Sequence, residues 1–236
     1  MTDPQTFRTV LRDAGFPEGY VVIADGAAEP LPLPGALTLR FDAGWNLAVE
    51  DYGMSERLAH FDTFDEVAEV ALQYLSGLSA PSERLDDSGL AAAIDAQAAY
   101  FVELRVALAS STPLGLSLPA GTVVDHQGTP DGLLLYLPDS KFSERSLPFH
   151  VLDATRTDFG RFYYRVEQPF RVQAAIVPPF YGQPGGALYF RLSPATTIRR
   201  LLAAGSLRRV EVSTGTDPNT TSTPRPDDPT YVRLEP

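Results

Sequence analysis

The stretch from Pro178 to Gly186 constrains this chain more than any other, because an apolar run stops there in a turn with three glycines. It reads Pro-Pro-Phe-Tyr-Gly-Gln-Pro-Gly-Gly. Glycine has no Cβ, so such a turn lets the backbone approach a ligand closely, and it equally suits a β-bulge or a tight hairpin with no ligand. For the turn taken alone, the bulge or hairpin is the commoner structure. The functional interpretation therefore depends on the residues elsewhere in the chain.

The composition indicates an ordinary globular protein. The chain has 236 residues, 44% of them hydrophobic and 21% charged, which suits one large domain or two small ones. No apolar run is long enough to span a bilayer, and the N-terminus lacks the pattern of a secretory signal. We expect no membrane contact, and a protein that is cytoplasmic or exported by a route without a cleaved signal peptide. Because there are no cysteines, disulfides, thiolate metal sites and a cysteine nucleophile are excluded.

Charge is distributed unevenly along the chain. Residues 1–113 hold 6 Lys+Arg and 18 Asp+Glu, whereas residues 114–212 hold 11 and 8. Such asymmetry indicates separate modules. The acidic first half argues against nucleic acid as a partner, and the mildly basic second half would suit an anionic small molecule or reflect ordinary surface variation.

Residues 1–80 predict a small acidic α+β module. Apolar residues recur at helical spacing over 4–15, and short alternating runs indicate strands at 20–23, 37–41, 45–51 and 56–61. Thr63 and Glu66 form the pattern of a capping box that opens a second helix. We expect a helix, a small antiparallel sheet and a helix. His60 has no neighbour at metal-ligand spacing and is interpreted as structural.

Residues 81–113 predict a linker followed by an amphipathic helix. The polar stretch 79–88 contains a proline and is typical of a linker, whereas 90–108 is rich in alanine with apolar residues in register. This helix either bridges two modules or packs on one of them. Residues 114–212 then alternate strands and turns, with one helical turn at 142–148 and a helix over 197–204. Residues 213–236 have the composition of a disordered tail.

No nucleophile elbow, zinc-protease motif, P-loop or dinucleotide fingerprint is present. What remains is a set of polar and aromatic residues that could bind a nucleotide. Arginine can pair with a diphosphate, and glutamine or tyrosine can hydrogen-bond to ribose hydroxyls or to an amide. Aromatic rings can stack on a base. The set is Asp125, His126, Arg145, Tyr163, Tyr164, Gln183 and Tyr189.

Several short motifs occur in a fixed order along the second module. They are Leu118-Pro119-Ala120-Gly121-Thr122, Val124-Asp125, Gly128-x-x-x-Gly132, Phe142-x-Glu144-Arg145-Ser146-Leu147-Pro148, Tyr164-x-Val166, Gly182-Gln183-Pro184-Gly185-Gly186 and Leu201-Leu202-Ala203-Ala204-Gly205-Ser206-Leu207. In this order they resemble the tuberculosis necrotizing toxin domain family, whose members are NAD⁺ glycohydrolases, over roughly residues 116–212.

The resemblance implies hydrolysis of the bond between nicotinamide and ribose in NAD⁺ or NADP⁺ by a bacterial, soluble protein, which would be either an antibacterial toxin or a regulated intracellular enzyme. It implies a mostly β module with a twisted mixed sheet, so that the whole chain is of the α+β class. It implies no cofactor, NAD⁺ or NADP⁺ as the ligand, and an immunity protein as a partner. The residues that it implies for catalysis are Gln183, Arg145, His126 and Tyr189, and those for substrate binding are Asp125, Tyr163, Tyr164, Gly182, Gly185 and Gly186.

Two of these positions depart from the family pattern. Members of the family usually have arginine where this chain has His126, and glutamine a few residues after the glycine pair, at the position of Tyr189. Both positions should face the Gly182–Gly186 turn. The departures leave a second hypothesis open, in which the module is catalytically degenerate and binds a nucleotide or a protein in an immunity or regulatory role.

Overall fold

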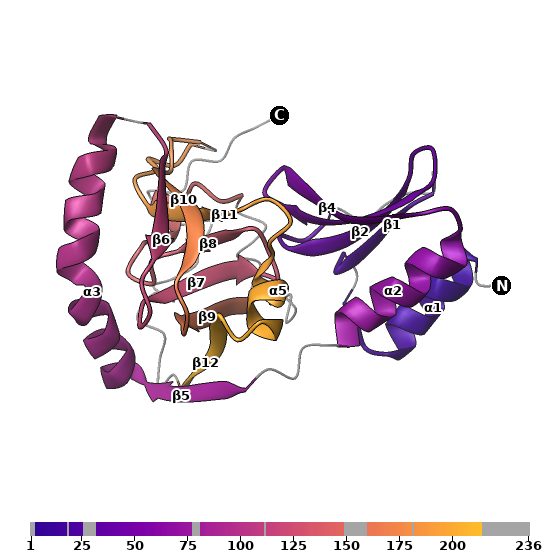
Figure 1. Ribbon diagram of the computed structural model, residues 1–236, viewed down its shortest axis with the longest axis horizontal. Coiled ribbons are helices and arrows are strands. Elements are labelled where there is room, and N and C mark those ends of the chain that lie inside the picture. Colours follow the sequence, from indigo (N-terminus) through magenta and orange to yellow (C-terminus); the bar gives the residue numbers. More distant parts are fainter. Residues whose placement is uncertain are drawn as a thin grey trace, which may run out of the picture.

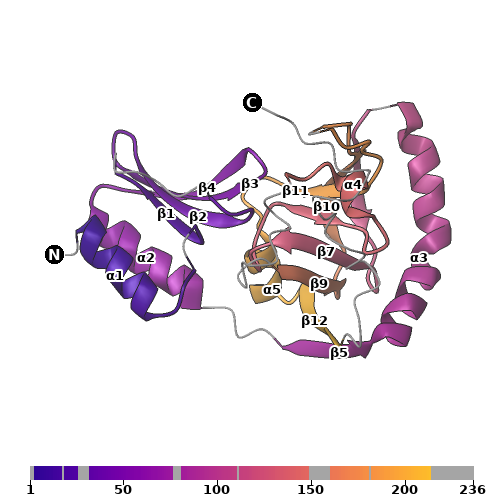
Figure 2. The same cartoon turned by 180° about the vertical axis from the view of Figure 1, so that it is seen from behind.

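The computed structural model describes residues 3–17, 19–25, 32–76, 81–110, 112–148, 160–180 and 182–213. They form two modules, each with its own sheet and hydrophobic core, which lie side by side in both views of the ribbon (Figure 1, Figure 2). The chain is therefore of the α+β class, as the sequence predicts. None of the described helices is long and apolar enough to cross a membrane.

The N-terminal module packs two helices against a four-stranded sheet. Asp3 caps the first helix by accepting hydrogen bonds of 2.9 Å from two backbone N–H groups, and Phe7 and Leu11 bury its apolar stripe. Thr63 and Glu66 form the expected capping box of the second helix. The elements are α1 (Pro4–Asp13), β1 (Val21–Ala24), β2 (Ala36–Phe41), β3 (Trp45–Asp51), β4 (Met54–Phe61) and α2 (Phe64–Ser76).

The expectation of a purely antiparallel N-terminal sheet is wrong for one pair. The strand order is β1-β2-β3-β4, and β1 pairs with β2 in parallel, whereas β3 pairs antiparallel with both β2 and β4. A parallel pair requires a connection that returns the chain to the same end of the sheet. The connection between β1 and β2 is therefore not a hairpin turn.

The second sheet has eight strands in the order β5-β12-β9-β7-β8-β11-β10-β6, mixed because β5 and β12 pair in parallel. All its other pairs are antiparallel. Its strands are β5 (Ser82–Asp86), β6 (Leu114–Leu118), β7 (Val123–Gly128), β8 (Leu134–Tyr136), β9 (Gly160–Val166), β10 (Phe170–Ile176), β11 (Leu188–Leu192) and β12 (Leu207–Ser213).

The prediction of a linker over 79–88 is wrong for Ser82–Asp86, which form the edge strand β5. Both faces of β5 are at least partly exposed, so its side chains are polar and give no hydrophobic alternation. The strand is held instead by backbone pairing with β12. Sequence reasoning that depends on apolar periodicity misses an edge strand of this kind.

Helix α3 (Asp87–Ala107) packs on the second module. Its residues Phe101 and Leu104 join the main core of the eight-stranded sheet. Gln97 fixes the helix to β7, because its amide accepts from Val123 N at 2.9 Å and donates to Val123 O at 3.0 Å. Of the two alternatives for this helix, packing on one module is the observed one (Figure 1). The remaining helical elements are η1 (Leu108–Ser110), α4 (Phe142–Arg145) and α5 (Ile198–Ala203).

The two modules share a specific polar interface. Tyr74 of α2 donates to Asp131 Oδ2 at 2.6 Å, and Arg199 of α5 donates to the carbonyl of Tyr74 at 2.6 Å. Near β4, Glu56 Oε1 accepts from Ala195 N at 2.6 Å. The backbones also approach closely, since a Cβ on Gly128 would lie 2.5 Å from Pro34 O. The modules are therefore in tight contact through bonded groups, and the N-terminal module has a defined position beside the candidate site.

Candidate functional site

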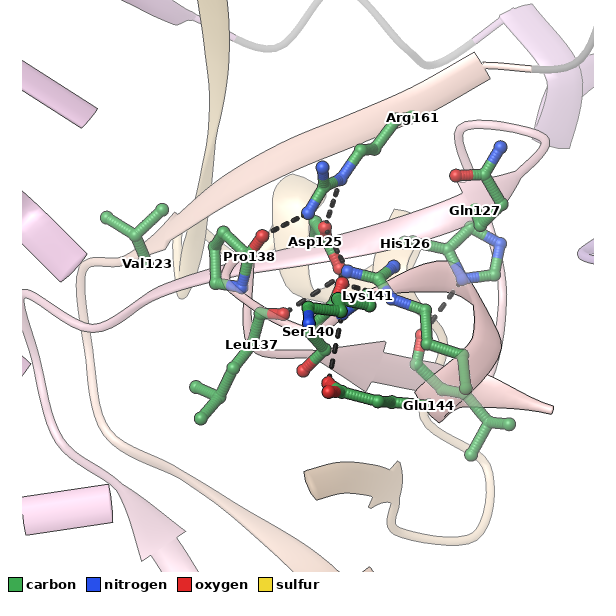
Figure 3. A network of polar contacts seen from close by, with 12 residues as sticks. Val123, Asp125, His126, Gln127, Leu137, Pro138, Ser140, Lys141, Glu144 and Arg161 are labelled. Carbon is green, nitrogen blue, oxygen red and sulfur yellow. Dashed lines mark hydrogen bonds and ion pairs between the residues drawn. The ribbon is translucent and has the colours of Figure 1, made fainter. Parts of the chain in front are cut away.

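Asp125 and two arginines form a buried charged network on the second sheet (Figure 3). Asp125 Oδ2, on β7, lies 2.7 Å from Arg145 Nη2 and also accepts from Arg161 Nε of β9. Arg145 is 3% exposed and Asp125 is fully buried. Two guanidinium groups on one carboxylate leave a net charge of about +1, which favours an anionic ligand nearby.

Arg145 also fixes the backbone of its own loop. Its Nε donates to Ser140 O at 3.3 Å and its Nη2 donates to Leu137 O at 3.2 Å. Its guanidinium lies over the ring of Tyr136, 4.9 Å from the centroid. The third nitrogen, Nη1, has no hydrogen-bond partner in the part of the chain that the structure describes. Arg145 therefore holds the loop with two of its three guanidinium nitrogens.

The turn that contains Arg145 contacts the Gly182–Gly186 turn directly. Ala187 N donates to Glu144 O at 2.9 Å, and Ser146 Oγ donates to Pro178 O at 3.0 Å. The side-chain amide of Gln183 donates to Leu147 O, which ties the two turns together. Segments about 40 residues apart in the sequence thus form one continuous wall.

Gln183 is buried, and only one of the two polar atoms of its side-chain amide has a hydrogen-bond partner among the described residues. Its Nε2 bonds Leu147 O, whereas Oε1 has no partner among the described residues. Gly185 has φ +69°, and a Cβ there would lie 2.5 Å from Val177 O. Gly182 and Gly186 also have positive φ, but open space surrounds them. Position 185 thus requires glycine because a Cβ would collide with the backbone of the same turn. At positions 182 and 186 only the positive φ favours glycine.

A cavity of about 510 Å³ lies where this wall meets the N-terminal module. Its size falls in the range of small-molecule sites. The second module lines it with Tyr136, Arg145, Ser146, Leu147, Pro148 and Phe180, and the N-terminal module lines it with Pro32, Leu33, Pro34, Glu50, Asp51, Tyr52 and Gly53. The candidate site is therefore composite, which the sequence does not predict.

The turn between β3 and β4 brings Asp51 and Tyr52 into this site. Asp51 Oδ2 accepts from the backbone N–H of Leu133 at 2.6 Å and of Leu134 at 3.0 Å. Tyr52 donates its hydroxyl hydrogen to Gln127 O at 2.6 Å. Sequence reasoning missed both residues, although the Tyr-Gly pair after an alternating strand does indicate the turn that presents them.

Burial changes the acidity of these two side chains. Burial raises the pKa of Asp51 to about 6, although the nearby His126 and the two backbone N–H donors lower it. Burial also raises the pKa of Tyr52 well above its ordinary value. Tyr52 is thus a neutral hydrogen-bond donor at neutral pH.

His126 is not where the sequence reasoning placed it. It is fully buried, its Nδ1 lies 2.9 Å from Leu134 O, and its ring packs edge-on against Tyr52 at 6.5 Å between centroids. Its Nδ1 is 4.0 Å from Asp51 Oδ2. Successive side chains of a strand point to opposite faces, so His126 lies on the other face of β7 from Asp125. The expectation that it faces the Gly182–Gly186 turn is wrong, because it contacts the N-terminal module instead.

The three tyrosines considered for the site lie in different environments. Tyr164 is in the main core with its hydroxyl on Pro130 O at 3.1 Å, so it cannot line the cavity. Tyr163 pairs with Asp125 across β9 and β7 and lies under the guanidinium of Arg161, 5.0 Å from the centroid. Tyr189 packs beside Tyr136 in a small cluster at the base of the glycine turn. Of the three, Tyr189 and Tyr163 border the network, and Tyr164 is structural.

Residues 117–210 match the family model described as tuberculosis necrotizing toxin. A similar solved structure is that of tuberculosis necrotizing toxin (TNT) complexed with its immunity factor IFT, with 20% identity and a TM-score of 0.35. The alignment covers 41% of this chain and 55% of that chain, so the chain spans little more than half the length of its relative. No curated protein matches.

Proposed function

Because residues 117–210 match the tuberculosis necrotizing toxin family, we propose that this protein is an NAD⁺ or NADP⁺ glycohydrolase that releases nicotinamide and ADP-ribose. The observation that carries the proposal is the place of Arg145. It lines the cavity, is anchored by Asp125, and keeps Nη1 unbonded among the described residues. A dinucleotide offers the diphosphate that such a group binds.

In the proposed reaction, the C1′–N1 bond between ribose and nicotinamide breaks and its electrons go to the pyridinium, which leaves as neutral nicotinamide. Water adds to C1′ from the solvent, gives up one proton, and completes ADP-ribose. The transition state resembles an oxocarbenium ion, as in other glycoside cleavage. Because the leaving group is already cationic, the protein mainly has to position the dinucleotide and admit water.

The wall formed by the two turns would do this positioning. Arg145 would hold the diphosphate, with Asp125 and Arg161 fixing its orientation. The bond from Gln183 to Leu147 would keep the two turns at a constant separation. The Tyr136 ring, which also lines the cavity, would offer an apolar surface to a base or to nicotinamide.

A second candidate function is nucleotide binding without hydrolysis. The burial of His126 and the packing of Tyr189 in a cluster favour it, because neither residue is among those that line the cavity. The family match supports a toxin role for the first candidate and leaves this second one open for the individual chain.

Incubation with NAD⁺ and NADP⁺, followed by chromatography of free nicotinamide, tests the activity. Hydrolysis predicts equal amounts of nicotinamide and ADP-ribose that grow with time. Saturable calorimetric binding of NAD⁺ with no nicotinamide above a buffer blank would support the second candidate. A toxin should also reduce bacterial growth when it is expressed without a neutralising partner.

A further inference from the structure

A second groove, of about 670 Å³, lies between the modules, away from Arg145 and Gln183. Strand β4 borders it from the N-terminal module, and strands β6, β10 and β11 form its floor. Strands β11, β10 and β6 are consecutive neighbours in the eight-stranded sheet (Figure 1). The polar residues that the argument uses are Ser55, Ser117, Arg171, Gln173, Arg191 and Ser193.

The floor brings two guanidinium groups close together. Gln173 of β10 pairs with Arg191 of β11, and Arg171 lies two residues before Gln173 on the same face. Arg171 and Arg191 are therefore diagonal neighbours, whose Cβ atoms in such a pair lie roughly 7–8 Å apart. One phosphate or diphosphate group can contact both side chains at that separation.

Neither guanidinium is neutralised within the described part of the chain. Arg171 and Arg191 are exposed, and no described carboxylate or carbonyl oxygen bonds either side chain. The one acidic residue in the lining, Glu56, has an oxygen bonded to Ala195 N at 2.6 Å. With Glu56 counted, the groove retains a charge of +1 in a chain whose net charge is −11.

The neighbouring positions leave room for an anion and offer it donors. Ser117 of β6 pairs with Arg171, so the two side chains project from opposite positions on the same face of the sheet. Gly115 pairs with Gln173, and nothing lies within 4 Å of the place where its Cβ would be. The polar side chains of the floor thus surround an open area over Gly115.

We propose that this inter-module groove binds a phosphate-bearing small molecule through Arg171 and Arg191. A phosphate or diphosphate has enough charge and oxygens to satisfy two guanidinium forks, whereas one carboxylate satisfies only one. The volume exceeds that of the anion alone, so the groove has room for the rest of such a molecule. This site is separate from the cavity at Arg145, and its existence does not depend on NAD⁺ hydrolysis.

The test is calorimetric titration of the full chain with inorganic pyrophosphate at fixed ionic strength, since salt screens exposed charges. We expect saturable binding that weakens about tenfold in Arg171→Gln and in Arg191→Gln, because each variant removes one charge-assisted contact to the anion. The double variant Arg12→Gln/Arg84→Gln removes two exposed charges elsewhere and should bind as the wild type does.

Three results would overturn the proposal. They are no saturable binding by the wild type, unchanged affinity in Arg171→Gln/Arg191→Gln, and an equal loss in Arg12→Gln/Arg84→Gln. Acetate should not compete at the same concentration, and equal competition by acetate would exclude the phosphate class. Because both groove arginines are exposed, their variants should keep the wild-type circular dichroism spectrum and unfolding midpoint.

Discussion

Arg145 Nη2 lies 2.7 Å from Asp125 Oδ2 in a site where the two side chains are 3% and 0% exposed. This ion pair connects β7 to the turn after α4, and through that turn to the glycine-rich turn. Burying ions costs free energy unless each is well paired, and removing one partner of a buried pair typically costs about 3–5 kcal/mol. The geometry of the proposed site therefore depends on Asp125 as much as on Arg145.

Asp125→Ala should lower the free energy of unfolding by about 3–5 kcal/mol, because it leaves the guanidinium groups of Arg145 and Arg161 without their shared carboxylate. Arg145→Ala should cost less, since Arg161 still neutralises Asp125. Urea unfolding measures both variants. Asp139→Ala, at an exposed position in the next loop, is the matched control and should change little. A cost below about 1 kcal/mol for Asp125→Ala would contradict the structural role given to this network.

Asp51 should make stability depend on pH. Its pKa is raised to about 6 in the folded protein, so the protonated form is favoured by folding. The resulting stabilisation is fully present below the unfolded pKa of about 4 and is lost as pH rises through about 6. The change corresponds to about 2–3 kcal/mol.

Urea unfolding of wild type and Asp51→Asn between pH 4 and 7.5 measures this contribution. Asparagine keeps an acceptor for Leu133 N and Leu134 N but does not titrate. The stability of the wild type relative to Asp51→Asn should therefore fall as pH rises. A constant difference across the range would show that Asp51 does not titrate in it. Asp13→Asn, at an exposed position on α1, is the matched control.

Tyr52 tests whether the N-terminal module forms part of the ligand site. Tyr52→Phe removes the 2.6 Å hydrogen bond to Gln127 O and should lower stability by about 1 kcal/mol, with NAD⁺ affinity unchanged because the ring remains. Tyr52→Ala removes the ring from the cavity and should weaken NAD⁺ binding about fivefold or more. Calorimetry compares the two. Equal NAD⁺ affinity of Tyr52→Ala and wild type would place the ligand away from this hairpin.

Gly128 tests the tight contact between the modules. It has φ +139°, and a Cβ there would lie 2.5 Å from Pro34 O. Gly128→Ala therefore strains the backbone at position 128 and also has to displace the backbone at Pro34. Gly121 also has positive φ, but open space surrounds it, so Gly121→Ala costs only the strain of about 1–2 kcal/mol. Chemical unfolding should find Gly128→Ala the less stable of the two. The reverse order would mean that the modules are not in contact at Pro34.

Local sequence patterns predicted most elements, because capping residues and alternation act over a few positions. The Thr63–Glu66 capping box and the strand Trp45–Asp51 are confirmed. Strand β5 was missed because an exposed edge strand has no apolar alternation to detect. The direction of β1 relative to β2 depends on how the connection returns, which strand propensity does not specify.

The candidate site was predictable only in part. The sequence grouped Arg145, Asp125 and Gln183, and the structure brings them together through the two turns. Asp51 and Tyr52 could not be found, because their partners lie about 75–82 residues away and no local pattern encodes such a contact. His126 was misplaced for the same reason, since its neighbours Asp51 and Tyr52 belong to the N-terminal module.

The rate of nicotinamide release from NAD⁺ tests the proposed function most directly, measured for wild type beside Arg145→Lys. Lysine keeps the charge but cannot hold Asp125, Leu137 O and a diphosphate in one planar fork. We predict steady release by the wild type, with kcat/KM reduced about 100-fold in a folded Arg145→Lys protein. No release from NAD⁺ or NADP⁺ above a buffer blank, by wild-type protein shown to be folded, would contradict the account.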